Sequence, residues 1–135
     1  MSSIMIDDLG RSIHIDGSAS ARVVSLCPSI TETLFDLGCG TSVVGRTKYC
    51  IHPSPAVDSV PSIGGTKKID LKAVLALAPS LVLAVKEENT REDVEALIAR
   101  GLRVFVFDVQ TVKQAMTMIR RIGDLLSATD AADAL

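Results

Sequence analysis

The run Leu81-Val82-Leu83-Ala84-Val85 decides the fold of this chain of 135 residues. Its uninterrupted apolar character is typical of a strand that is buried on both faces, as strands of parallel sheets are. A helix is predicted on either side of this strand. The first helix covers 71–77 with Asp70 as its N-cap, and the second is opened by Thr90 and Asp93 and ends at Gly101.

The alternation of strand and helix continues in both directions from this run. Downstream, a strand over 104–107 precedes a long helix, which Thr111 and Gln114 open as a capping box. Upstream, strands over 22–26 and 42–46 flank a helix over 30–37, for which Ser29 and Glu32 have the spacing of a second capping box. The apolar stripe expected on the last helix consists of Val112, Ala115, Met116, Ile119, Ile122, Leu125 and Leu126.

Four successive strand-then-helix units predict an α/β fold, a Rossmann-like sandwich with a mainly parallel sheet flanked by helices. Residues 4–15 alternate roughly between apolar and polar on either side of a turn that contains Gly10. This pattern predicts a short N-terminal β-hairpin that precedes the sandwich. The core of the sandwich is expected over residues 21–127.

Composition excludes several classes of function. A net charge of -2 and an aromatic content of 3% disfavour a nucleic-acid surface. No apolar run approaches the ~20 residues needed to cross a bilayer, so membrane insertion is not expected. Cys27, Cys39 and Cys50 are odd in number and lack a C-x-x-C spacing, which disfavours a disulfide framework and a zinc knuckle.

Motifs of common enzyme classes are weak. Gly64-Gly65-Thr66 has neither a G-x-G-x-x-G frame nor a G-K-[ST] ending, so these glycines are expected to form turns. Ser29 lies at a strand-to-helix junction, but G-x-S-x-G is absent and helix capping is the favoured role. Cys27 is beside the same helix N-terminus without a base nearby in sequence, and packing is its favoured role.

The loops at the carboxyl ends of the strands are where a ligand is expected. The loop over 47–68 is unusually long for a compact domain, and it holds Tyr49, the only tyrosine. An aromatic ring there suits a large planar ligand, or else covers a neighbouring loop. Cys50 and His52 form a C-x-H pair that could ligate a metal. Oxygens from 87–89 could join that pair, or Glu87 and Glu88 could form a solvated face.

Ordered motifs along most of the chain resemble one known family. They are the run 22–38, Val44-Gly45, Tyr49-Cys50-Ile51-His52-Pro53, Ile63-Gly64-Gly65-Thr66-Lys67, Asp70-Leu71, the run 75–83 and Glu87-Glu88-Asn89. Together they resemble the substrate-binding proteins of ABC importers for iron-siderophores and vitamin B12, the helical-backbone metal receptor class. The resemblance covers about 7–127.

The resemblance implies a non-enzymatic receptor with two α/β lobes, a long rigid helix between them and the ligand in the cleft. Residues 1–135 would be the N-terminal lobe, with 112–135 leading into the inter-lobe helix and the second lobe absent. The ligand would be a corrinoid such as vitamin B12 or an iron chelate, and no cofactor is required. By position, the ligand-facing residues would be Pro28, Ser29, Lys48, Tyr49, Gly65, Thr66, Glu88 and Asn89.

Two features depart from the family pattern. Lys72 stands where family members often carry a glutamate that contacts arginines of the transporter, and the reversed charge counts against docking on an ABC permease. Residues 1–8 do not resemble a signal peptide. As written the chain is expected in the cytoplasm, and in the periplasm or at the cell surface if a signal sequence precedes it.

Two other interpretations stay open at this point. The chain could be a cytosolic metal- or corrinoid-handling protein, or an enzyme, that reuses the fold with Cys50, His52, Glu87 and Glu88 near a metal or the cobalt of a corrinoid. It could also be a self-associating interaction domain, because a lone lobe would expose an apolar cleft face through which a homodimer could form.

Overall fold

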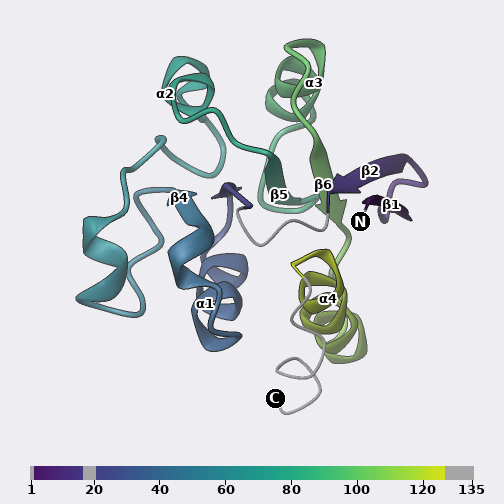
Figure 1. Ribbon diagram of the computed structural model, residues 1–135, viewed down its shortest axis with the longest axis horizontal. Coiled ribbons are helices and arrows are strands. Elements are labelled where there is room, and N and C mark those ends of the chain that lie inside the picture. The colour runs from purple at the N-terminus through teal and green to yellow at the C-terminus, as the bar shows by residue number, and fades with distance from the viewer. Residues whose placement is uncertain (1, 17–20, 127–135) are drawn as a thin grey trace.

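The computed structural model describes residues 2–16 and 21–126, and it shows a four-stranded parallel sheet between two pairs of helices (Figure 1). The strands are β3 (Val23–Ser25), β4 (Val43–Gly45), β5 (Leu81–Val85) and β6 (Val104–Phe107), in the order β4-β3-β5-β6. The helices are α1 (Pro28–Asp36), α2 (Leu71–Ala76), α3 (Arg91–Ala99) and α4 (Val112–Leu125). The predicted α/β sandwich is therefore confirmed.

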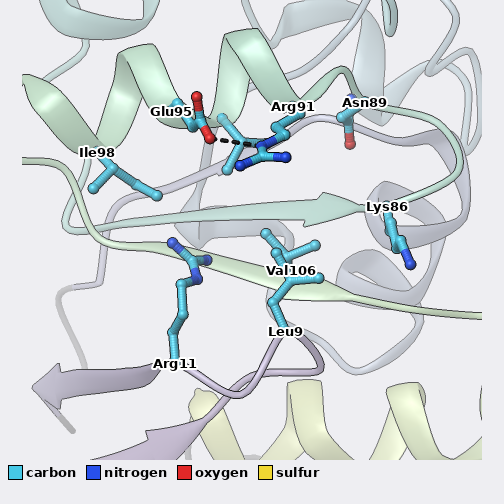
Figure 2. Close-up of a pocket in the computed structure, with 9 residues that line it drawn as sticks. Leu9, Arg11, Lys86, Asn89, Arg91, Glu95, Ile98 and Val106 are labelled. Atoms are coloured by element: carbon cyan, nitrogen blue, oxygen red, sulfur yellow. Dashed lines mark hydrogen bonds and ion pairs between the residues drawn. The ribbon is translucent and has the colours of Figure 1, made fainter.

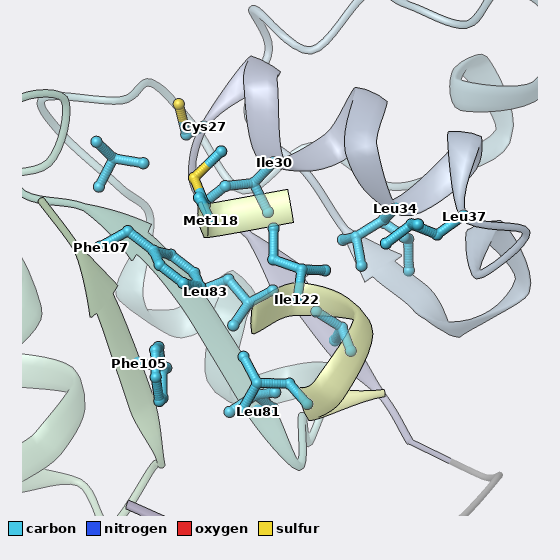
Figure 3. Close-up of a cluster of buried hydrophobic side chains, with 14 of the residues drawn as sticks. Cys27, Ile30, Leu34, Leu37, Leu81, Leu83, Phe105, Phe107, Met118 and Ile122 are labelled. Atoms are coloured by element: carbon cyan, nitrogen blue, oxygen red, sulfur yellow. The ribbon is translucent and has the colours of Figure 1, made fainter. Parts of the chain in front are cut away.

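Each face of the sheet has its own hydrophobic core, because side chains alternate between the faces along every strand. In Figure 1, α1 and α4 lie below the sheet and α2 and α3 above it. Leu83 and Phe107 pack on the lower side against Ile30 of α1 and Ile122 of α4 (Figure 3). The upper core contains Val24, Leu26, Ile63, Ile69, Val74, Val82, Ala84, Val94, Leu97, Val104 and Val106.

The N-terminal hairpin is confirmed, and its turn has a role that its sequence pattern does not reveal. Strands β1 (Ser2–Ile6) and β2 (Ser12–Asp16) pair with each other, and the turn lies against the free edge of β6. The backbone N–H of Asp8 donates to the carbonyl oxygen of Val106 (2.9 Å), and Val106 N–H donates to the Asp7 carboxylate (3.2 Å). Arg11 donates to the carbonyl oxygen of Val104 (2.8 Å). The turn therefore satisfies backbone groups that would otherwise be available for edge-to-edge pairing.

The predicted helix caps are confirmed for three helices and wrong for one. Asp70 and Thr90 accept from the backbone N–H of the third residue of their helices, and Thr111 forms the expected capping box with Gln114. Helix α1 begins two residues earlier than expected, with Cys27 as N-cap, Pro28 in the first turn and no side-chain cap. The proposed capping box of Ser29 and Glu32 is thus wrong, because Ser29 already lies inside the helix.

The stripe expected on the last helix is only partly buried. Ile122 and Leu125 are buried as predicted, whereas Val112 and Met116 are 80% and 66% exposed. Met118, which the stripe omitted, takes a core position instead. The predicted continuation of this region over 127–135 lies outside the described residues.

The loop over 47–68 is long but ordered by short elements. It contains the 3-10 helix η2 (Ala56–Ser59) and is joined to the sheet by a bridge between Arg46 and Ser62. A second 3-10 helix, η1 (Gly40–Ser42), precedes β4. The Arg46 side chain donates to the carbonyl oxygens of Val57 and Val60, both at 2.9 Å. No helix among the described residues has the length and apolar character of a membrane span.

Candidate ligand-binding site

The strand order reverses direction between β3 and β5, which is the position where open α/β sheets bind ligands. The chain passes from β3 to β4 on one side and then returns to add β5 on the other side of β3. Loops that leave two such strands diverge, and ligands of open α/β sheets bind in the space between them. The predicted ligand-facing residues follow three strands of the sheet: Pro28–Ser29 follow β3, Lys48–Tyr49 and Gly65–Thr66 lie in the long loop after β4, and Glu88–Asn89 follow β5.

The structure brings four of the predicted residues together around one cavity of about 520 Å³. They are Lys48, Tyr49, Gly65 and Thr66. The Tyr49 side chain is 53% exposed, and the Lys48 ammonium lies 5.3 Å from the centre of its ring. A Cβ on Gly65 would lie 3.6 Å from Tyr49 Cε2, so the glycine backbone is in contact distance of the ring edge. The result is an exposed aromatic surface with a small residue beside it.

One backbone hydrogen bond holds the glycine loop (64–68) beside the segment that carries Tyr49, and a second one closes the glycine loop on itself. Lys48 N–H donates to the carbonyl oxygen of Gly64 (2.8 Å), and Gly65 N–H donates to that of Lys68 (3.0 Å). Gly64 has a φ of +102°, and a Cβ there would lie 3.0 Å from Asp70 N and Lys68 O. Glycine is therefore required at this turn, which presents Gly65 to the cavity.

Asn89 holds the loops together from inside and does not face the cavity. The residue is 5% exposed, and its side-chain amide donates to the carbonyl oxygens of Leu26 (2.8 Å) and Thr66 (3.0 Å). Its side-chain oxygen accepts from Val85 N–H (2.9 Å). Asn89 thus connects the ends of β3 and β5 to the glycine loop.

Pro28, Ser29 and Glu88 lie apart from this cavity. Ser29 and Glu88 are exposed and Pro28 is partly buried at the start of α1. The Ser29 hydroxyl lies 3.3 Å from the Cys27 sulfur. Burial raises the pKa of the Cys27 thiol, and the charge of Glu88 adds to this increase, so Cys27 does not have the lowered pKa of a reactive thiol.

Cys50 and His52, the predicted metal ligands, differ in environment. The Cys50 sulfur is buried, accepts from the Thr31 hydroxyl at 3.1 Å and lies 3.1 Å from the Thr47 hydroxyl, whereas His52 is exposed. Among the described residues, no three histidine, cysteine or acidic side chains converge as a metal site would need. Cys50 has a structural role here, fixing the Tyr49 loop to α1.

Sequence reasoning missed the charged side chains of the cavity. Lys67, Lys68 and Asp70 line it together with Lys48, Tyr49 and the glycine loop. Lys67 donates to the carbonyl oxygen of Glu87, which ties the cavity wall to the end of β5. The adjacent pair Lys67-Lys68 directly after Gly64-Gly65-Thr66 was the available signal.

Glu87 and Asp108 form a carboxyl pair at the ends of β5 and β6. Partial burial raises the pKa of Glu87, and its hydrogen bond to Asp108 and the Asp108 charge raise it further. The hydrogen bond from Glu87 lowers the pKa of Asp108, as does that from Gln110. Lys86 lies 3.9 Å from the Asp108 carboxylate. The Glu87 carboxyl is thus engaged with β6 and is not among the cavity lining.

A second hollow, of about 410 Å³, lies between α3 and the hairpin turn (Figure 2). Leu9, Val106 and Ile98 form much of its apolar lining, and Arg91 at its rim is paired with Glu95 at 2.7 Å. Of the predicted ligand-facing residues, only Asn89 borders this hollow. Its side chain is already engaged in the hydrogen bonds to Leu26, Thr66 and Val85 described above.

Comparisons with known proteins place this architecture in one class. The family described as periplasmic binding protein matches residues 23–135. The chain is 29% identical over 107 residues to a vitamin B12-binding protein of Photorhabdus laumondii, covering 79% of this chain and 38% of the relative. It is 30% identical over 111 residues to a vitamin B12-binding protein of Yersinia pestis, covering 82% and 39%.

Comparison with solved structures also finds binding proteins with this fold. A periplasmic heme-binding protein of Pseudomonas aeruginosa superposes with a TM-score of 0.78 at 27% identity, over 84% of this chain and 41% of that one. The vitamin B12-binding protein of Vibrio cholerae superposes with a TM-score of 0.71 over 84% and 46%, and at 20% identity it supports the fold alone.

The chain belongs to the periplasmic binding protein family. It spans about two fifths of the length of the vitamin B12-binding relatives, which it matches over 38–39% of their sequences. The resemblance noted from its motifs is confirmed at the level of this family.

Proposed function

We propose that the chain is the N-terminal lobe of a two-lobed, non-enzymatic substrate-binding protein, and that it supplies one wall of a site for a planar metal-containing ligand. The observation that carries this proposal is the exposed Tyr49 ring beside Gly65, in the long loop that follows β4. An aromatic ring with a glycine beside it offers a flat apolar surface on which a macrocycle can stack.

A corrinoid is the first candidate ligand. The support is the position of Tyr49, which matches by resemblance the place where B12-binding members put an aromatic against the corrin, and the two vitamin B12-binding relatives. The rigidity of the surrounding loops supports a preformed site, because Asn89 and Lys67 both tie the glycine loop to the end of β5.

An iron chelate, including heme, is the second candidate. Its support is the heme-binding protein of Pseudomonas aeruginosa among the superposed structures and the basic character of the cavity wall. Both candidates use the same surface, so they are distinguished by titration and not by the location of the site.

The protein partner of such a lobe would be an ABC permease, and the charge of Lys72 bears on whether the lobe can dock on it. It is exposed in the first turn of α2, where the family resemblance leads to the expectation of a glutamate. A lysine there would repel arginines of a transporter. We therefore propose ligand binding as the function of the cavity beside Tyr49, and we assign no transporter contact to α2.

The test is a calorimetric titration of the full-length natural protein with cyanocobalamin, hemin and a ferric siderophore. Saturable binding of cyanocobalamin or hemin, with one site per chain, is the expected result, and binding of the octahedral ferric siderophore alone would contradict a planar ligand. Absence of heat change with all three, on a protein shown by circular dichroism to be folded, would overturn the proposal.

A further inference from the structure

Three lysines surround the cavity that the Tyr49 ring borders. Lys48, Lys67 and Lys68 line it, and Asp70 is the one carboxylate among the lining residues. One Asp70 oxygen already accepts from Ala73 N–H as the cap of α2. The wall of the proposed binding site is therefore basic although the whole chain carries a net charge of -2.

The ammonium groups of these lysines are not neutralised by acidic side chains of the described residues. In the part of the chain that the structure describes, none of the three forms an ion pair. Lys67 donates to a neutral backbone oxygen of Glu87, and Lys48 lies over the Tyr49 ring. The nearby acid Glu87 is engaged with Asp108, and neither Glu87 nor Glu88 lines the cavity.

Unpaired cations around a concave surface create a positive potential that attracts anionic ligands and opposes cationic ones. A flat ligand that stacks on Tyr49 would bring its rim to the neighbouring wall, where Lys68 is exposed next to Gly65. Lysine ammonium groups bind carboxylates and phosphates as flexible point charges, without a fixed geometry. They therefore suit a ligand whose anionic groups hang from the edge of a ring.

We propose that the ligand of this site is a planar metal chelate that carries anionic groups, carboxylates or a phosphate, at its rim, and that Lys67 and Lys68 select it. This inference rests on the proposed function, since it names the chemical class of the ligand at the same surface. It predicts discrimination between ligands that share a ring system and differ only in rim charge.

Two pairs of probes test the inference on the full-length natural protein. Hemin is compared with hemin dimethyl ester, and cobyrinic acid, whose corrin rim carries free carboxylates, with the corresponding heptamethyl ester. In at least one pair, the free acid is expected to bind about tenfold more tightly than the ester, since two or three exposed charge pairs of ordinary strength are lost on esterification. That advantage should shrink as salt rises from about 0.05 to 0.5 M.

Substitutions attribute the effect to the lysines. Lys68→Gln should weaken binding of the free acid about two- to fivefold and leave binding of the ester unchanged, as expected for one exposed ion pair. Lys67→Gln should likewise weaken binding of the free acid more than binding of the ester. Lys113→Gln, an exposed lysine on α4 away from the cavity, is the matched control and should change neither affinity.

The outcomes separate the two proposals. Equal affinity for acid and ester in both pairs, without salt dependence, would overturn the inference and leave the proposed function standing. Failure of all four probes would overturn the inference as well. If cyanocobalamin and the ferric siderophore also failed to bind, the proposed function would fall with it.

Discussion

The side-chain amide of Asn89 donates a hydrogen bond of 3.0 Å to the carbonyl oxygen of Thr66. The two residues are 23 positions apart, one at the end of β5 and the other at the end of the glycine loop. The same side chain reaches Leu26 and Val85. This buried carboxamide therefore joins the glycine loop, which carries Gly65, to the ends of β3 and β5.

Replacement of Asn89 with leucine should destabilise the lobe strongly. The substitution leaves the buried carbonyl oxygens of Leu26 and Thr66 and the N–H of Val85 without their partner, at a total cost of about 2–4 kcal/mol in the free energy of unfolding. Urea denaturation followed by circular dichroism measures it. The control is Gln110→Leu, which alters an exposed amide, and a loss for Asn89→Leu no larger than that of the control would contradict this role.

Asp7 should be essential for the hairpin to cover β6. Its carboxylate is buried and accepts from the N–H groups of Leu9 and Val106 and from Arg11. Asp7→Ala is expected to lower the free energy of unfolding by about 2–4 kcal/mol, because the buried N–H of Val106 is left without its acceptor and Arg11 loses its ion-pair partner. It should also promote association, because the edge of β6 becomes available.

Light scattering at increasing concentration detects that association. Asp36→Ala, at the exposed end of α1, serves as the control. If Asp7→Ala unfolded at the same urea concentration as this control and stayed equally monodisperse, the hairpin would have no such protective role.

Gly64 and Gly65 should respond oppositely to alanine. Gly64→Ala places a side chain at a φ of +102° and 3.0 Å from two backbone atoms, so a loss of about 1–3 kcal/mol in stability is expected. A Cβ on Gly65 makes only ordinary contacts of 3.6–3.8 Å. Gly65→Ala should therefore leave the melting temperature nearly unchanged and weaken ligand binding, since the methyl group fills space beside Tyr49.

Thermal melts and titrations of the two variants, compared side by side, check this contrast. Equal destabilisation by both substitutions would contradict the positive φ at Gly64 as the reason for glycine there. Unchanged affinity of Gly65→Ala would remove Gly65 from the binding surface.

The carboxyl pair of Glu87 and Asp108 predicts a pH dependence. The pKa of Glu87 is raised in the folded state, so its favourable contribution is complete at acid pH and is lost as the pH rises through that folded-state pKa. The lowered pKa of Asp108 has the opposite sign, and its contribution is lost as the pH falls through the folded-state value.

Glu87→Gln keeps a hydrogen-bond donor toward Asp108 and removes the ionisation. Its melting temperature relative to the parent protein should therefore rise between about pH 4 and pH 8. The effect should be small because Glu87 is exposed and Asp108 is only partly buried. Glu32→Gln on the exposed side of α1 is the control, and a parallel shift for both variants would rule out the carboxyl pair as the cause.

Local patterns were sufficient to predict the sheet and most of the helices. The run Leu81–Val85 is buried along its whole length, and Thr111 caps α4 as its spacing with Gln114 indicates. The start of α1 was misplaced because Pro28 is equally suited to the first turn of a helix, a position where its missing N–H costs nothing. The exposure of Val112 could not be predicted, since an apolar stripe does not specify how far along a helix the core extends.

The candidate site was only partly accessible to sequence reasoning. Position in the loops correctly grouped Tyr49 with Gly65, which the structure places side by side. Asn89 was expected to face the ligand, but its burial depends on contacts with residues 23 and 63 positions away, and no local pattern reports these. Lys68 was missed for the same reason, because the cavity forms only when the loop folds back on Lys48.

The central claim is that the ring of Tyr49 is the surface on which a planar ligand stacks. The most direct measurement is calorimetric titration of Tyr49→Ala and Ile51→Ala in the full-length protein, with whichever of cyanocobalamin and hemin the parent protein binds more tightly. Both side chains are exposed, at 53% and 59%, so neither substitution should unfold the lobe. Loss of the ring is expected to weaken binding about tenfold or more, while Ile51→Ala binds like the parent protein. Equal affinities of the two variants would contradict the account.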